Sequence, residues 1–133
     1  MAFVLDASVA LGWVAAKQAT ACSRRMRLRA RREPYHAPAL WRLEVVNAVR
    51  SLERRRALSS DAADTAIGIL ERMQPVMHEA TMPLADLLRL ARKFDLSAYD
   101  ANYLALALEL KMPIACGDGP LRTVLAKAGV KPV

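Results

Sequence analysis

The chain has 133 residues, of which 54% are hydrophobic and 25% charged, a composition that fits one globular domain over residues 1–133 and excludes intrinsic disorder. No apolar run reaches the roughly 18 residues of a membrane span, and the N-terminus lacks the basic segment and cleavage site of a signal peptide, so we expect a cytoplasmic protein. The formal net charge of +7 favours a polyanionic partner, although the solvated helix faces of a basic protein would explain it equally well.

The positive charge comes mostly from arginine, which is concentrated in two runs. One is the triplet at residues 54–56, and the other spans residues 24–32 and contains Arg24, Arg25, Arg27 and Arg29. A guanidinium group donates two parallel hydrogen bonds to a phosphate. The longer run is therefore our candidate contact for a nucleic-acid backbone.

Cysteine and histidine give no sign of a metal site of their own. Cys22 and Cys116 have no paired cysteine or Cys/His spacing, so neither a disulfide framework nor a zinc site is expected. His36 and His78 are equally isolated, and we interpret both as structural or surface residues.

The first half of the chain alternates short apolar runs with helical patterns. We expect a strand at residues 3–5, a short apolar helix at 8–16, a basic helix at 20–32 and a long helix at 39–56. Pro34 and Pro38 should end the basic helix. The long helix has apolar residues at three- to four-residue spacing on one face: Trp41, Val45, Val49 and Leu52.

The second half continues this alternation. We expect a helix from the cap at residues 59–61 to about Met73, a weak strand at 75–79, a helix from 82 to 94, a helix that begins at Ser97, a strand at 113–116, a helix at 121–128 closed by Gly129, and a short edge strand at 130–133. The helix after Ser97 is apolar almost all round, so it should be buried. Strands separated by helices predict an α/β fold, with a mainly parallel sheet covered by helices on both faces.

Two acids follow the two most convincing strands. Asp6 comes directly after residues 3–5, and Asp118 comes shortly after residues 113–116. In a parallel sheet, functional groups gather beyond the carboxyl ends of the strands, so both acids should lie on the same edge. Each could instead cap the helix that follows it, and Asp118 precedes a proline that suits a first helical turn.

Two further acids lie on predicted helices. Asp100 follows Ser97 at the spacing of a capping box, which would explain it without any catalytic role. Glu44 lies within the long helix among apolar residues, where a carboxylate is costly to bury without a cation or a hydrogen-bond partner. Asn47, one turn further on, would share its face and could support it, whereas Arg42 and Arg50 share that face less well.

Three blocks of sequence place these acids in a recognisable order. The blocks are VLDASV at residues 4–9, PALW leading to EVVNA at 38–48, and LSAYDA followed by YLALA at 96–107. Together they resemble the PIN-domain ribonucleases, and most closely the VapC toxins of toxin–antitoxin pairs. The resemblance covers essentially the whole chain and implies a three-layer α/β/α sandwich.

Carried over to this sequence, the resemblance implies that Asp6, Glu44 and Asp100 are the core metal-binding and catalytic acids. It makes Asp118 the fourth acid and Ser8 the hydroxyl beside the first. The chain departs from the family near Asp118, where Cys116 replaces a common threonine and Gly119 and Pro120 replace a common second acid or asparagine.

A site with oxygen ligands, and without the softer sulfur or imidazole ligands, suits Mg²⁺, or alternatively Mn²⁺. The resemblance implies in-line hydrolysis of an RNA phosphodiester by an activated water, with no covalent intermediate, and with Asp118 holding a second ion or positioning the water. It also implies a homodimer held inactive by a cognate antitoxin protein.

Three alternatives compete with this interpretation. A haloacid-dehalogenase-type phosphatase would need a second aspartate where Ser8 stands, and a receiver domain would need an acidic pair and a late lysine that we do not find. The third alternative is a PIN-like module that has lost catalysis and binds RNA or protein.

Overall fold

The computed structural model describes residues 1–133 and contains one four-stranded sheet. The strands are β1 (Phe3–Leu5), β2 (Tyr35–Pro38), β3 (Val76–His78) and β4 (Ile114–Ala115). They pair in the order β3-β2-β1-β4, and all three pairings are parallel.

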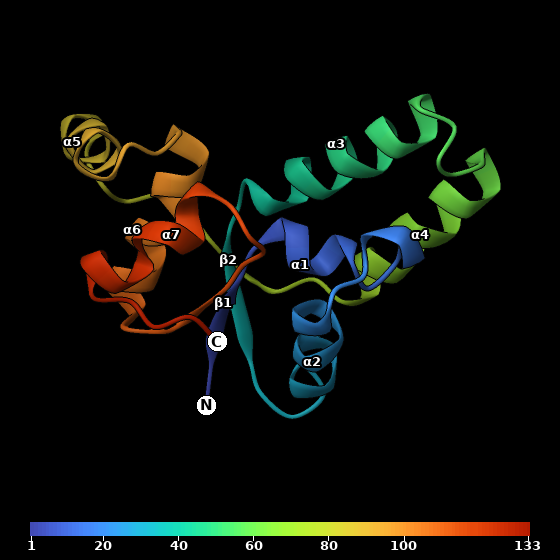
Figure 1. Ribbon diagram of the computed structural model, residues 1–133, viewed down its shortest axis with the longest axis horizontal. Helices are drawn as coiled ribbons and strands as arrows, with labels where there is room; N and C mark the ends of the chain where they lie inside the picture. Colours follow the sequence, from blue (N-terminus) through green and yellow to red (C-terminus); the bar gives the residue numbers. More distant parts are fainter.

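Seven α-helices surround the sheet: α1 (Ala7–Leu11), α2 (Ala21–Arg29), α3 (Trp41–Arg54), α4 (Ser60–Arg72), α5 (Leu84–Phe94), α6 (Ala98–Leu110) and α7 (Pro120–Ala128), with a short 3-10 turn η1 (Ala16–Gln18) after α1. Helices α1 to α4 cover one face of the sheet and α5 to α7 cover the other, which confirms the predicted three-layer α/β/α sandwich (Figure 1). None of these helices is both long and apolar enough to cross a membrane.

The helical predictions hold where the apolar pattern is strong. The buried residues of α3 are Trp41, Val45, Val49 and Leu52, the four that the spacing selects. Helix α6 is buried on most sides, as its composition predicts, and its buried residues are Ala101, Tyr103, Leu104, Ala105, Leu106 and Ala107. The predicted caps are present as well: Ser59 and Ser97 cap α4 and α6, and Gly129 ends α7 in the left-handed region.

Strand β2 is an element that the sequence pattern failed to predict. Its four residues follow Pro34 and end with Pro38, two prolines that we interpreted only as helix breakers. The strand forms because its side chains have partners far along the chain: the Tyr35 ring stacks on Phe3 with centroids 5.8 Å apart and meets Trp13 edge-on at 6.0 Å. Such non-local packing leaves little trace in a local pattern.

Three boundaries also differ from the prediction. Residues 130–133 form only an isolated bridge between Pro132 and Ile114 rather than a strand, since proline has no N–H to donate to a ladder. Helix α2 ends at Arg29 instead of continuing to residue 32. Helix α1 ends at Leu11, before Gly12, where a Cβ would lie 2.6 Å from the Ser23 hydroxyl oxygen; glycine therefore permits the close approach of the chain to α2.

The topology places a crevice at one edge of the sheet. From β1 the chain reaches β2 through α1 and α2 on one face, and it returns from β3 to β4 through α5 and α6 on the other. The strand order therefore reverses between β1 and β4, and ligand sites of open α/β sheets lie at the carboxyl ends of the strands beside such a reversal.

Candidate active site

Asp6 lies at this reversal, directly after β1. Its backbone N–H donates to the carbonyl of Ala115 at 2.9 Å, so the β1–β4 pairing fixes where the residue stands. Its carboxylate caps α1 by accepting the Ser8 backbone N–H at 3.3 Å, and it also accepts the Ser8 hydroxyl. Burial raises the pKa of Asp6, and the nearby charge of Asp100 raises it further, although the Ser8 hydrogen bonds act in the opposite direction.

Ser8 connects this acid to the other strand of the reversal. Its hydroxyl oxygen accepts the Gly117 backbone N–H at 3.4 Å, so one side chain bridges the turn after β1 and the loop after β4. A Cβ on Gly117 would lie 3.4 Å from the same oxygen, which is an ordinary van der Waals contact. The structure thus places Ser8 beside the first acid, where the sequence predicted it.

Glu44 enters the crevice from the first turn of α3. It is half-buried, and its Oε1 accepts the hydroxyl of Tyr103 at 2.7 Å. Burial raises the pKa of Glu44, the Tyr103 hydrogen bond lowers it, and the charges of Asp6 and Asp100 raise it again. Glu44 therefore belongs to the same electrostatic cluster as the other two acids.

Asp100 lies in the first turn of α6, where capping was the alternative explanation. Its backbone N–H donates to the Ser97 hydroxyl at 3.1 Å, so Ser97 does cap the helix. The carboxylate returns no hydrogen bond to Ser97, in contrast to α2, where Thr20 and Ser23 form a complete capping box. Capping of the helix therefore does not involve the Asp100 carboxylate. Burial raises the pKa of this group.

The three acids share one electrostatic property: no cation compensates them. All five ion pairs of the chain involve other acids, although the sequence contains 20 lysines and arginines. In this structure no three His, Cys, Asp or Glu side chains lie close enough together to coordinate one metal ion. The donor chemistry nevertheless fits a hard divalent cation, because it consists of carboxylate and hydroxyl oxygens with uncompensated charge.

Asp118 lies apart from these three acids. Its side chain is fully exposed, 3.9 Å from the Arg122 Nε, and it makes no hydrogen bond to the helix that follows. The structure therefore brings Asp6, Glu44 and Asp100 together and leaves the fourth predicted acid in solvent at the same edge.

Residues 3–124 match the sequence model of the PIN domain. The chain belongs to the PIN-domain family. PIN domains are generally nucleases that typically use divalent metals, which supports a nuclease role for this chain. The crystal structure of PAE2754 from Pyrobaculum aerophilum is similar, with a TM-score of 0.68 and 25% sequence identity over 100% of this chain and 84% of that one. The comparison with curated proteins found no match.

Cys116 lies where the sequence resemblance led us to expect a threonine, and its thiol is buried. Burial raises the pKa of its thiol to about 12, with a further contribution from Asp6, so the group stays protonated near neutral pH. Its carbonyl accepts a hydrogen bond from Arg122 at 3.2 Å. We interpret Cys116 as part of the packing beneath the site.

The helical spacing suggested Asn47 as a support for Glu44. Asn47 is exposed and makes no hydrogen bond to Glu44. The partner comes instead from Tyr103, which the sequence pattern assigned only to the apolar surface of its helix. A signal was present, because a buried tyrosine usually needs a partner for its hydroxyl.

The arginines of α2 lie near the opposite edge of the sheet. The Arg29 guanidinium is 5.6 Å from the ring centroid of Phe3, at the start of β1, and it pairs with Glu33 at 2.7 Å. Arg27 donates to the carbonyl of Trp13 at 3.2 Å. Figure 1 shows α2 beside the N-terminus of the chain, away from the ends of the strands where the acids lie.

The two remaining predicted arginines are exposed. Arg25 donates to the carbonyl of Val133 at 3.2 Å, whereas Arg24 makes no hydrogen bond or ion pair within the chain. Arg24 is therefore the most available of the four predicted arginines.

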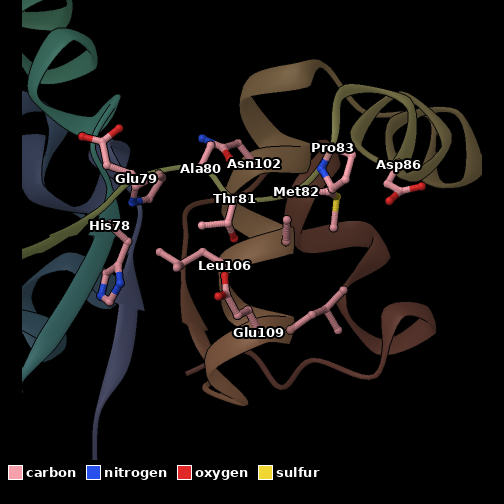
Figure 2. A pocket seen from close by; sticks show the side chains of 13 residues that line it. His78, Glu79, Ala80, Thr81, Met82, Pro83, Asp86, Asn102, Leu106 and Glu109 are labelled. Carbon is pink, nitrogen blue, oxygen red and sulfur yellow. The ribbon is translucent and has the colours of Figure 1, made fainter.

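A separate open pocket of about 400 Å³ lies between α5, α6 and the segment after β3 (Figure 2). Asn102 lines it, two residues after Asp100 and therefore on the opposite side of α6. None of the three clustered acids lines this pocket, so it is distinct from the candidate site.

Proposed function

We propose that this PIN domain is a Mg²⁺-dependent endoribonuclease, with Mn²⁺ as a possible substitute, and that Asp6, Glu44 and Asp100 form its metal centre. One observation supports this most. Burial raises the pKa of all three half-buried carboxyl groups, and neighbouring acids raise the pKa of Asp6 and Glu44 further, while no lysine or arginine pairs with any of them. A divalent cation removes that penalty, and few structural roles require such an arrangement.

Each acid would have its own part in the chemistry. A bound ion supplies charge for the scissile phosphate and a polarised water for its hydrolysis. Asp6, which the Ser8 hydroxyl orients, and Asp100, whose carboxylate makes no hydrogen bond within the chain, would hold the ion. Glu44 would be the third acid of the site. Asp118 would position water or a second ion if its side chain turned from solvent towards the other acids.

We propose that the RNA backbone follows the positive surface of α2, with Arg24 and Arg25 as phosphate contacts. Both are exposed, and guanidinium groups suit phosphate recognition. Arg27 and Arg29, which the sequence included in the same run, already bind protein groups and would contribute mainly long-range positive charge.

We further propose that the protein is a VapC-type toxin in the cytoplasm, forming a homodimer and inhibited by an antitoxin protein. The motif resemblance supports the class of toxin, and exposed apolar residues on α3 offer an interface: Leu43 is 74% exposed and Val46 52%. Mass measurement of the chain, alone and with the product of the neighbouring gene, tests both partners.

Cleavage of a structured RNA, followed with and without excess EDTA, tests the nuclease proposal. We expect cleavage that depends on Mg²⁺ and stops on chelation. RNA binding without cleavage would instead favour a catalytically impaired PIN module, an alternative favoured by the solvent-exposed position of Asp118. Full cleavage in EDTA would contradict the metal mechanism.

A further inference from the structure

The hydroxyl that reaches Glu44 comes from the opposite layer of the molecule. We infer that Tyr103 is a positioning residue of the metal centre, which fixes the Glu44 carboxylate relative to Asp6 and Asp100. This inference rests on the proposed function, since it assigns a role to a side chain that would act through a metal ligand.

The position of the hydrogen bond is unusual within this fold. Tyr103 lies on α6, one turn after Asp100, and its hydroxyl donates to Glu44 on α3 at 2.7 Å. Helices α6 and α3 cover different faces of the sheet (Figure 1). Among the side-chain to side-chain hydrogen bonds of the chain, this one alone joins the two helical layers. One helix therefore supplies one acid of the site and orients a second.

The surroundings of Tyr103 keep its hydroxyl a donor. Tyr103 is fully buried, so its hydroxyl is shielded from water and finds its partner within the chain. A phenol donates one hydrogen bond, and here the acceptor is Glu44.

The same contact leaves half of the Glu44 carboxylate available. Tyr103 occupies Oε1, while Oε2 accepts no hydrogen bond within the chain. A carboxylate held by one oxygen presents the other in a defined direction, as outer hydrogen bonds generally do for metal ligands. A buried tyrosine that needed only a partner could use a carbonyl instead, as Tyr35 does with Met73 at 3.1 Å.

This contrast supplies a matched pair of variants. Tyr103→Phe and Tyr35→Phe each remove one hydroxyl and one hydrogen bond while conserving the ring. We measure Mn²⁺ affinity from the electron paramagnetic resonance signal of the free ion, and the melting temperature of the metal-free chain by calorimetry. Tyr103→Phe should weaken Mn²⁺ binding by roughly 10- to 100-fold, the range for lost outer-shell partners, whereas Tyr35→Phe should leave it unchanged. Both should melt slightly below the wild type.

A second comparison shows whether Tyr103 acts through Glu44. In a Glu44→Ala background, Tyr103→Phe should cause little further loss of Mn²⁺ affinity, because coupled residues are not additive. Unchanged affinity in Tyr103→Phe, or the same loss with and without Glu44, would overturn the inference while leaving the metal centre intact. A wild-type chain that binds no Mn²⁺ would overturn the metal centre itself.

Discussion

At the scale of single residues, the three clustered acids differ in what else holds them. Asp6 also caps α1, and Glu44 also accepts the hydroxyl of Tyr103, but the carboxylate of Asp100 makes no hydrogen bond within the chain. Asp100 is thus the acid whose loss should disturb the fold least. A substitution of Asp100 can therefore test catalysis with the least effect on the stability of the fold.

We therefore expect Asp100→Asn to reduce RNA cleavage by more than about 100-fold, beyond the range of an outer-shell loss, with an unchanged circular dichroism spectrum. The matched control is Asp95→Asn, which removes the same charge at an exposed left-handed cap that asparagine tolerates. Cleavage by Asp100→Asn at the rate of this control would show that Asp100 is not catalytic.

The pKa of Asp6 makes a separate prediction about stability. Burial and Asp100 raise the pKa of Asp6, so the metal-free folded chain binds the proton more tightly than the unfolded chain. The ionised carboxyl therefore destabilises the fold, fully at a pH above its pKa in the folded chain and not at all below its pKa in the unfolded chain. Asp6→Asn should therefore raise the melting temperature of the chain at neutral pH in EDTA.

Asparagine can still cap α1, which limits the cost of that substitution. The gain should shrink as the pH falls towards 4, since the wild-type carboxyl then becomes neutral. A gain that stays constant with pH, or a loss at neutral pH, measured by calorimetry, would contradict the burial argument.

The sequence predicted some of these residues better than others. Glu44 stood out because a carboxylate among apolar helical residues demands an explanation. The role of Tyr103 was not predictable in the same way, because helical periodicity shows which side chains are buried but not what their hydroxyl groups meet. Helical spacing likewise placed Asn47 near Glu44 without showing whether the two side chains form a hydrogen bond, and in this structure they do not.

At the scale of elements, α6 joins the core to the site. Its buried apolar residues fix the helix against the sheet, and its first turn presents Asp100 at the crevice. The helix was predictable because its apolar pattern and its Ser97 cap are local signals. Strand β2 was not, because its pairings with β1 and β3 join residues far apart in the sequence.

The cap of α6 should therefore matter for both stability and metal binding. Ser97→Ala and Ser59→Ala each remove a capping hydroxyl and should each cost about 1 kcal/mol of unfolding free energy. Only Ser97→Ala should also weaken Mn²⁺ binding, since frayed residues at the start of α6 would move Asp100. Equal Mn²⁺ affinity of the two variants in a titration would show that the cap does not position the acid.

At the scale of the whole molecule, the three clustered acids are separated from the arginines of α2. The acids gather at the carboxyl ends of the strands, while α2 lies beside the N-terminus (Figure 1). The net charge of +7 gives the molecule as a whole an attraction for a polyanion. The sequence predicted the acids of β1 and β4 at one edge, but the separation from α2 depends on how the helices pack.

This arrangement distinguishes two arginines of α2. Arg24→Ala should weaken RNA binding and make the plot of log affinity against log salt shallower by about 0.7, the value for one phosphate contact with single-stranded RNA. Arg27→Ala should instead cost about 1 kcal/mol of stability, because it loses its bond to Trp13. Identical salt slopes for Arg24→Ala and the wild type would exclude Arg24 as a phosphate contact.

The central claim is that three acids form one metal centre, and calorimetric titration of Mg²⁺ into the metal-free chain tests it most directly. We expect one binding event in the wild type that persists in Asp118→Asn and disappears in both Asp6→Asn and Asp100→Asn. Absence of binding to the wild type, or binding that survives the loss of either clustered acid, would contradict the account.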